Sequence, residues 1–405
     1  MRMAIITAAL LIAGQANAQP AEQPVFSFQS GRPTLNLADG NLTVRPVLRL
    51  DLDGGSFWGQ AEPGGFGSGV NVRRGRLGLQ GTFLRDFSYN FTWDFAPSSP
   101  QGQSNGGSIF ELQAAYEGLK WATFRVGAFT LLHTLEFSGS SFETLFMERA
   151  SIVTLATSMA SGTTRLAAGV EARGERWFAS FYLSDGVLST LHDDRQGGVV
   201  GRAAWLALDD TVKLQVGLSG VYQFRPGPNS LESVRLRDYP ELRLDPQRFV
   251  DTGSIPASAG WSIGPEVSGM VGPLHFAAEY YHVGVDARSG GDRGFDGWYA
   301  ALAYPLLGEP RRRDAKRGAW AKGRAEDLNP AAGTWGALEL AGRYSAIDLN
   351  DGLTRGGRQG IWTAALNWYP TSRLRLTAQY MNGRIALDGP DRDFQAVGMR
   401  LAFNL

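Results

Sequence analysis

Apolar and polar residues alternate along most of the chain. In the stretch DFSYNFTWDF, residues 86–95, every second residue from Phe87 to Phe95 is aromatic and every residue between is polar. A period of two places the two sets on opposite faces of a β-strand. The aromatic face therefore contacts either the core of a water-soluble protein or the lipid around an inside-out barrel.

Segments of about ten residues with this alternation recur to the last residue, and turn residues separate them. We predict sixteen strands, near residues 44–53, 72–83, 86–96, 108–117, 121–129, 164–172, 175–184, 198–208, 211–224, 261–271, 274–284, 297–306, 335–346, 360–369, 373–384 and 394–405. No long helical period competes with this pattern.

The links between these strands alternate in length. Most links from an even-numbered to an odd-numbered strand are tight, such as Leu84-Arg85 and Gly272-Pro273. The long links are 54–71, 97–107, 130–163, 185–197, 225–260, 285–296, 347–359 and 385–393, and 307–334 is long where a short one is expected. This alternation gathers the long loops at one end, as in outer-membrane barrels.

The predicted fold is all-β, a sixteen-stranded antiparallel transmembrane β-barrel. A barrel of this width cannot be filled by side chains and holds water, so its polar face points inward. The alternative is a soluble β-sandwich, which would not need an apolar face on every strand together with a polar opposite face.

The N-terminus indicates export. Arg2 precedes an apolar run over residues 3–13, and Ala16-Asn17-Ala18 follows as a cleavage site of the A-x-A type. The run is too short to span the hydrocarbon layer, about 30 Å thick. We predict a signal peptide at 1–18, a short irregular segment at 19–43, a barrel over 44–405 and a location in the outer membrane of a Gram-negative bacterium.

Composition excludes several classes of function. The 39 basic and 39 acidic residues balance, so the chain as a whole is no nucleic-acid binder. It has no cysteine and only four scattered histidines, so we expect neither a disulfide framework nor a metal site, and no cofactor. Four of the basic residues are lysines, which leaves 35 arginines. Genomic base composition explains most of this ratio, so position carries more information.

Three arginine clusters stand out. The first is VRRGR, with Arg73, Arg74 and Arg76, and Arg45 and Arg49 precede it on the first strand. Alternation turns all of these inward except Arg73. The second cluster lies in the link 225–260 and the third, GEPRRRDAKR, in the link 307–334. For these two, the alternative is a solvated charged loop.

Together these motifs resemble one family. The carrying stretches, in chain order, are VRRGRLGLQGTFLRDFSYNFTWDF, SGSSFETLFMERA, RLRDYPELRL, GPLHFAAEYY and WGALELAGRYSAIDLNDG. They resemble the phosphate-selective porins O and P of Gram-negative outer membranes. The resemblance implies a homotrimer of barrels embedded among lipid and lipopolysaccharide. It also implies that the segments near 130–163, 225–260 and 307–334 fold into the lumen.

The resemblance also implies residue roles. The implied constriction residues on the inward loop are Ser140, Ser141 and Arg149. On the wall they are Arg49, Arg73 and Arg74, with Asp94 as the acid that orients these wall arginines. An arginine ladder at the mouth comprises Arg235, Arg237 and Arg243. Two departures from the family pattern are Asp238-Tyr239 after the RLR motif and the scarcity of lysine.

These features predict a passive porin that prefers anions such as phosphate, pyrophosphate or polyphosphate. A cluster of fixed cations in a narrow pore raises the local concentration of anions. The alternatives are a general or differently selective pore and, more remotely, a barrel enzyme. His275 points inward with only Glu279 near it on its strand, which is more typical of a lumen residue than of a catalyst.

Overall fold

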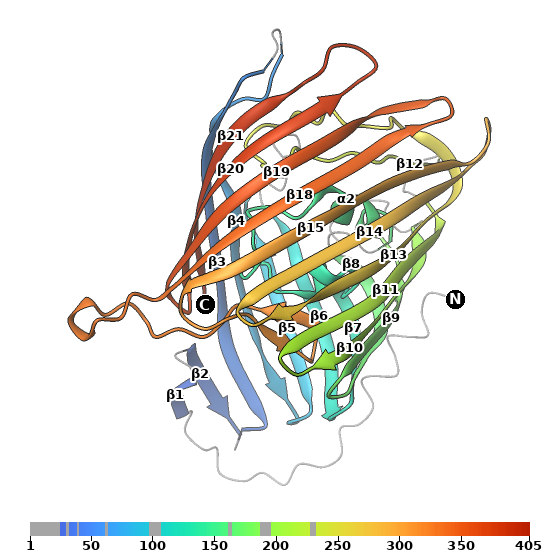
Figure 1. Cartoon of the computed structure of the whole chain (residues 1–405). Helices are drawn as coiled ribbons and strands as arrows, with labels where there is room; N and C mark the ends of the chain where they lie inside the picture. The colour runs from blue at the N-terminus through green and yellow to red at the C-terminus, as the bar shows by residue number, and fades with distance from the viewer. Residues whose placement is uncertain are drawn as a thin grey trace.

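The computed structural model describes residues 25–29, 32–38, 40–60, 64–96, 107–160, 164–186, 196–226 and 232–405. Over these residues the chain forms a closed barrel of sixteen antiparallel strands (Figure 1). They are β3(Leu42–Trp58), β4(Gly69–Phe83), β5(Phe87–Asp94), β6(Ser108–Leu119), β7(Ala122–Phe129), β8(Arg165–Arg173), β9(Trp177–Ser184), β10(Gly197–Asp209), β11(Val212–Arg225), β13(Ile255–Val271), β14(Leu274–Ala287), β15(Arg293–Leu307), β18(Ala337–Asp351), β19(Thr354–Thr371), β20(Leu374–Ala386) and β21(Phe394–Asn404). The last strand pairs with the first, with Met399 opposite Gly54. The sixteen predicted strands and the fold class are confirmed.

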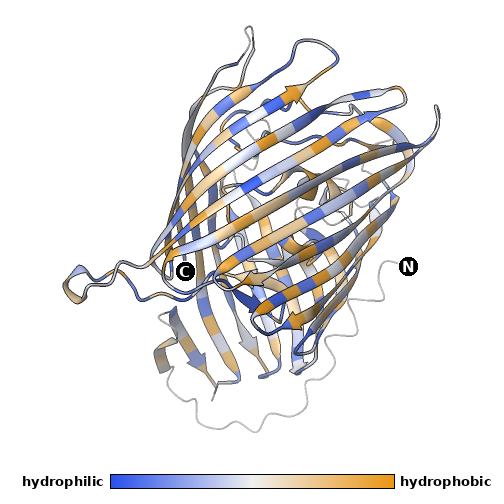
Figure 2. Ribbon diagram, viewed as in Figure 1, coloured by the Kyte–Doolittle hydropathy of each residue, from blue (hydrophilic) through white to orange (hydrophobic). Residues whose placement is uncertain are grey.

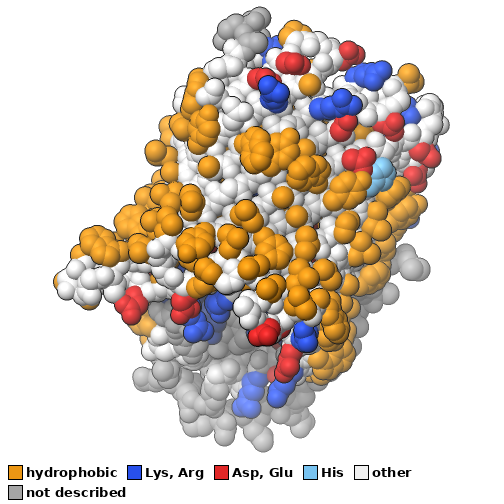
Figure 3. All heavy atoms as spheres, in the orientation of Figure 1, with side chains coloured by type: hydrophobic (Ala, Val, Ile, Leu, Met, Phe, Trp, Pro, Cys, Tyr) orange, Lys and Arg blue, Asp and Glu red, His pale blue; other side chains and the backbone are white. Residues whose placement is uncertain are grey.

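The aromatic face of the opening stretch points outward. On β5, Phe87 and Phe91 are exposed, whereas Thr92, the residue that follows Phe91, is buried on the inner side. Hydropathy alternates along most strands in the same way (Figure 2). In the space-filling view the apolar side chains form a belt, with charged side chains above and below it (Figure 3). Such a belt is the surface that a barrel presents to the hydrocarbon layer.

Strands β18 and β19 differ from the prediction at one end. We predicted a long link at 347–359, but β18 runs to Asp351 and β19 begins at Thr354. Gly352 makes the tight turn with a φ of +54°, which glycine adopts without strain. Beyond the apolar belt the outward side chains need not be apolar, so the alternation fades in the sequence while the hydrogen-bonded ladder continues.

The N-terminal segment also differs. We predicted irregular chain at 19–43, but β1(Val25–Gln29) and β2(Arg32–Leu37) form a hairpin that extends the sheet beyond the start of β3. The free edge of β3 offers backbone partners to this segment, which explains its strand conformation. The predicted signal peptide, residues 1–18, lies outside the described part of the chain.

Three segments pack against the inner wall. Residues 130–160 carry α1(Leu135–Ser138) and α2(Ser151–Thr157), and Figure 1 shows α2 inside the barrel. Residues 232–254 carry β12(Ser233–Val234). The link after β15 carries the hairpin of β16(Arg312–Asp314) and β17(Ala319–Ala321), which packs inside, and then η2(Pro330–Ala332), which is exposed. Only the first part of the predicted inward segment near 307–334 therefore packs inside.

These segments bond directly to the wall. The Asn367 Nδ2 donates to the Leu145 carbonyl over 2.8 Å, and the Trp320 Nε1 donates to the Ser268 hydroxyl over 2.9 Å. A large cluster of buried apolar side chains, including Phe146 and Leu242, fills the space between segments and wall. The lumen is therefore partly packed. Among the described residues, no helix is long and apolar enough to cross a membrane.

Candidate functional site

A β-bulge places two consecutive arginines on the inner wall. Asp51 of β3 lies opposite Arg74 of β4, but the next residue, Leu52, lies opposite Val72. Arg73 is therefore the extra residue, and a bulge of this kind re-aims side chains. Simple alternation turned Arg73 outward, whereas the structure brings it inside beside Arg74.

Carboxylates of the wall hold these arginines. Asp51 accepts from the Nε and Nη2 of Arg49 at 2.6 and 2.9 Å and from the Nη1 of Arg74 at 2.6 Å. The Nε and Nη2 of Arg400 on β21 donate to the two carboxylate oxygens of Asp53, each over 2.6 Å. All of these side chains are buried, so each pair is fixed in position.

Glu148 of the inward segment joins the wall arginines to a second segment. Its carboxylate contacts Arg73 at 2.7 Å, Arg400 at 2.8 Å and Arg243 at 3.3 Å. Burial alone would raise the pKa of Glu148, but these arginines outweigh it and hold that pKa well below the ordinary value. Glu148 therefore stays ionised and fixes three guanidinium groups around one point.

We call this assembly the arginine cluster. It comprises Arg49, Arg73, Arg74, Arg243 and Arg400 with Asp51, Asp53 and Glu148. Five cations minus three anions leave a formal charge of +2. Sequence reasoning predicted four of the five arginines for the site but not Arg400. The signal that could have found Arg400 was barrel closure, which places it directly opposite Asp53.

Asp94 does not orient the three arginines for which we predicted it. It lies opposite Arg76 and accepts from the Arg76 Nε at 2.7 Å. Asp51 and Glu148 take the role predicted for Asp94. The physical reason is the register of the sheet, which brings Asp94 level with Arg76 and below Arg74.

The predicted constriction residues lie at the edge of the cluster. The carbonyl of Ser141 accepts from Arg49 at 3.4 Å, and the hydroxyl of Ser140 accepts from the backbone of its own turn. Arg149 turns away from the wall, because its Nε donates to the Glu136 carbonyl at 3.2 Å and its guanidinium lies 4.0 Å from the ring centre of Phe137. Glu148, its neighbour in sequence, occupies the central position instead.

The predicted ladder is divided. Arg235 and Arg237 share Asp251, and their side chains are 43% and 34% exposed. Arg243 lies deeper and reaches Glu148, and its guanidinium is also 4.8 Å from the Tyr239 ring centre. The structure therefore brings Arg243 into the arginine cluster and leaves the other two nearer the long-loop end.

Among the described residues, inward polar side chains differ in exposure between the two sides of the lumen wall. The inward polar side chains of β13–β15 and β18–β21 that bond the inward segments are buried, as shown by Ser268, Glu279, Arg343 and Asn367. On β4–β7, six inward polar side chains are only partly buried, namely Arg76, Gln80, Asn90, Glu111, Gln113 and Arg125. From this difference in exposure we infer that the open path runs along β4–β7, beside the arginine cluster.

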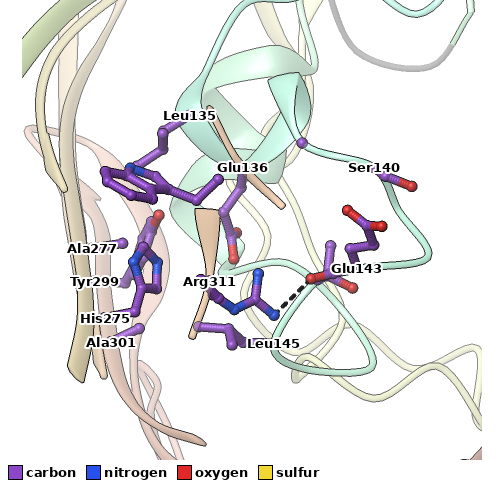
Figure 4. A pocket seen from close by; sticks show the side chains of 13 residues that line it. Leu135, Glu136, Ser140, Glu143, Leu145, His275, Ala277, Tyr299, Ala301 and Arg311 are labelled. Atoms are coloured by element: carbon purple, nitrogen blue, oxygen red, sulfur yellow. Dashed lines mark hydrogen bonds between the residues drawn. The ribbon is translucent and has the colours of Figure 1, made fainter. Parts of the chain in front are cut away.

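A small cavity lies on the packed side of the barrel. It has a volume of about 60 Å³ and lies between the inward segment, the β16–β17 hairpin and strands β14 and β15 (Figure 4). Arg311 reaches into it and donates to the Glu143 carbonyl at 2.9 Å, while His275 lines the opposite side. A space of this size holds a few water molecules, so we do not place the conducting path there.

Asp238 makes the cluster sensitive to pH. Its carboxylate lies 3.7 Å from Arg243. Burial raises its pKa to about 6 despite Arg243. Above that pH Asp238 adds a fourth carboxylate, so the formal charge of the cluster rises from +1 to +2 as the pH falls through 6.

We expect anion preference to increase on acidification. In a KCl gradient, the permeability ratio of chloride to potassium should be about threefold higher at pH 5 than at pH 7.5, because Asp238 is then neutral. Asp238→Asn should show the higher ratio at both pH values. A pH dependence that persists unchanged in Asp238→Asn would assign the titration to another group.

Comparison with known proteins gives consistent matches. The family model for the phosphate-selective porins O and P matches residues 48–405. An uncharacterized protein of Caulobacter vibrioides is 26% identical over 394 residues, covering 93% of this chain and 76% of its own. Porin O of Pseudomonas aeruginosa is 24% identical over 375 residues, covering 83% of this chain and 82% of its own.

Solved structures agree with the fold. The anion-selective porin from Comamonas acidovorans superposes with a TM-score of 0.55 at 13% identity, over 89% of this chain and all of its own. The trimer form of OmpT, an outer membrane protein of Vibrio cholerae, gives 0.53 at 11% identity, over 90% of this chain and 99% of its own. At these identities the likeness concerns the fold alone.

Proposed function

The chain belongs to the phosphate-selective porin O and P family, and on that premise we propose that it conducts phosphate and related oxyanions passively. Its barrel and its family place it among the outer-membrane porins, and they point to a channel and not to an enzyme. The finer assignment to oxyanions rests on the arginine cluster described above.

One observation carries the proposal: the cluster keeps a positive formal charge beside the open side of the lumen. Arg73 and Arg243 are 15% and 25% exposed there. Guanidinium forks match the oxygens of phosphate and replace its hydration. Because carboxylates already hold these arginines, an anion meets a preformed site with a modest net charge. Binding is then weak enough to permit release.

A general pore is the second candidate. Three carboxylates within the arginine cluster, those of Asp51, Asp53 and Glu148, oppose the field of the arginines. If their field prevails in the lumen water, the pore discriminates little among small ions. The selectivity measurement below separates the two candidates.

The test is single-channel recording of the purified protein in a planar bilayer. We expect the reversal potential in a KCl gradient to show anion preference, and millimolar phosphate to block chloride current. Arg73→Gln should raise the half-blocking phosphate concentration about tenfold, because it removes one positive charge from the cluster beside the lumen. Arg358→Gln, on the outer surface and 67% exposed, is the matched control and should behave as wild type.

An unselective or cation-selective pore that phosphate does not block would retain the porin assignment and reject the oxyanion assignment. Equal effects of Arg73→Gln and Arg358→Gln would reject the arginine cluster as the selective element.

The setting of the channel is part of the proposal. We propose that residues 1–18 direct export, that the barrel lies among lipid and lipopolysaccharide of a Gram-negative outer membrane, and that it forms homotrimers. Support for the trimer comes from the trimer form of OmpT, which shares the fold. Mass measurement of the detergent-solubilised protein, before and after heating, tests the oligomeric state.

A further inference from the structure

A patch of three amide side chains around one carboxylate lines the open wall below the arginine cluster. It consists of Gln80, Asn90, Glu111 and Gln113, and we call it the amide patch. Gln80 lies directly opposite Asn90, and Asn90 directly opposite Gln113, on three adjacent strands. All four side chains point inward and remain partly exposed, so they face the water of the open path.

A second β-bulge adds an aromatic ring to this wall. Trp93 lies opposite Ile109 but the next inward residue of β5, Thr92, lies opposite Glu111, so Phe110 is the extra residue. The guanidinium carbon of Arg76, an inward residue, lies 3.3 Å from the ring centre of Phe110. The alternation of β6 would turn Phe110 toward lipid, whereas the bulge turns it into the lumen. Bulges that re-aim side chains are frequent beside functional sites.

Hydrogen bonds order the patch around one carboxylate. The amide groups of Asn90 and Gln113 both donate to the same oxygen of Glu111, Oε2. The Gln113 carbonyl in turn accepts from Arg125, which is itself paired with Glu171. Within the described chain no protein group bonds the other oxygen of Glu111, so Oε1 can accept a hydrogen bond from a permeating molecule.

The chemistry of the patch differs from that of the arginine cluster. A carboxylate only accepts hydrogen bonds and repels a bare phosphate, whereas amides donate and accept. Hydroxyl groups also donate and accept hydrogen bonds, so they match this combination. Because a hydroxyl carries no charge, it can donate a hydrogen bond to Glu111 without the repulsion that a phosphate meets. A molecule that carries hydroxyls beside a phosphate therefore gains contacts here that inorganic phosphate lacks.

The spacing suits one small molecule. Arg76 lies opposite Asp94, and Thr92 and Glu111 face each other two residues further along β5. Two residues of a strand span about 7 Å, which is the length of a three-carbon phosphate ester. Arg76 bonds Asp94 through its Nε. Among the described residues its outer nitrogens form no hydrogen bond, so they keep their donors for a ligand, and the guanidinium lies beside the ring of Phe110.

We propose that the amide patch is a second subsite, which recognises phosphate esters of polyols and makes them preferred substrates over unsubstituted phosphate. The inference rests on the proposed function, because Arg76 and the arginine cluster would hold the phosphate group. It adds a substrate class that the arginines alone do not distinguish.

The test compares three probes as blockers of chloride current at pH 7.5: inorganic phosphate, n-propyl phosphate and glycerol 3-phosphate. The last two have similar size and charge but differ in hydroxyls. For wild type we expect glycerol 3-phosphate to block at about fivefold lower concentration than n-propyl phosphate. This ratio is the difference in affinity that corresponds to one net hydrogen bond. The double variant Asn90→Ala/Gln113→Ala should remove the difference.

Ser88→Ala is the matched control, because Ser88 faces inward on the same strand but lies outside the patch and bonds Glu117. It should keep the fivefold difference. Equal block by the two esters in wild type, or a difference that survives in the double variant, overturns the subsite. If none of the three probes blocks, the proposed function fails as well, whereas block by inorganic phosphate without preference for glycerol 3-phosphate rejects the subsite alone.

Discussion

Replacing Glu148 by glutamine should lower the half-blocking phosphate concentration about tenfold and raise the permeability ratio of chloride to potassium. The carboxylate of Glu148 contacts Arg73, Arg243 and Arg400, so its charge opposes any anion bound there. One charge about 6 Å from a bound anion contributes about 3 kcal/mol at an effective dielectric constant near 20. Lumen water and salt reduce this toward the 1.4 kcal/mol of a tenfold change.

Glutamine keeps the volume and one acceptor oxygen of Glu148, so the inward segment should stay in place. Arg400 also retains Asp53. Glu339→Gln is the matched control, because it removes the same charge from a buried pair with Arg311, away from the arginine cluster. Unchanged selectivity in Glu148→Gln would place the conducting path elsewhere. Raised conductance with loss of phosphate block would instead mean that the charge of Glu148 is needed to hold the constriction.

The strands could be predicted because lipid requires an apolar side chain at every second position. That requirement is strong where strands cross the membrane and vanishes beyond it. Residues 347–359 contain DLNDGLTRGGRQ, which has the composition of a loop, yet Asp348 and Arg358 face each other across two paired strands. Hydrogen bonding of the backbone, which the side-chain pattern does not record, sets the true ends of β18 and β19.

The arginine wall shows the limit of pattern reasoning at single residues. Three arginines lie within four positions at 73–76, so the sequence contains no apolar residue there to fix the phase of the strand. The bulge at Arg73 shifts that phase by one and brings Arg73 inside with Arg74. At Phe110 the sequence indicated the opposite side, because an apolar residue in alternation normally faces lipid.

Whether partners far apart in the sequence could be predicted depended on the closure of the barrel and on the orientation of the inward segment. Arg400 and Asp53 are brought together by the pairing of the last and first strands, which the strand count implies once the barrel is assumed closed. That Glu148, and not Arg149, lies at the centre of the arginine cluster could not be predicted in this way. Which side an irregular segment presents depends on its packing against the wall, here through Phe146 and Met147.

Replacing Glu279 by alanine should release the inward segment and have the largest effect on the pore. Glu279 of β14 is buried and accepts four hydrogen bonds. Two come from the backbone of Leu135 and Glu136 at 3.0 and 3.1 Å, and two from the hydroxyls of Tyr281 and Tyr299 at 2.9 Å each. Removing one partner of a buried hydrogen bond costs about 1–3 kcal/mol. We expect the loss of several such bonds to exceed the free energy that holds the inward segment against the wall.

We expect Glu279→Ala to raise single-channel conductance about twofold, to increase current noise and to abolish phosphate block, because the segment that carries Glu148 leaves the wall. Thr134→Ala is the matched control, since the Thr134 hydroxyl accepts only from Phe137 within the same short helix and its loss costs about 1 kcal/mol. If Glu279→Ala instead keeps wild-type conductance and phosphate block, the apolar packing around Leu131 and Ile152 holds the segment without the carboxylate. The hydrogen bonds of Glu279 would then serve only to satisfy buried polar groups, and the constriction would be a product of packing.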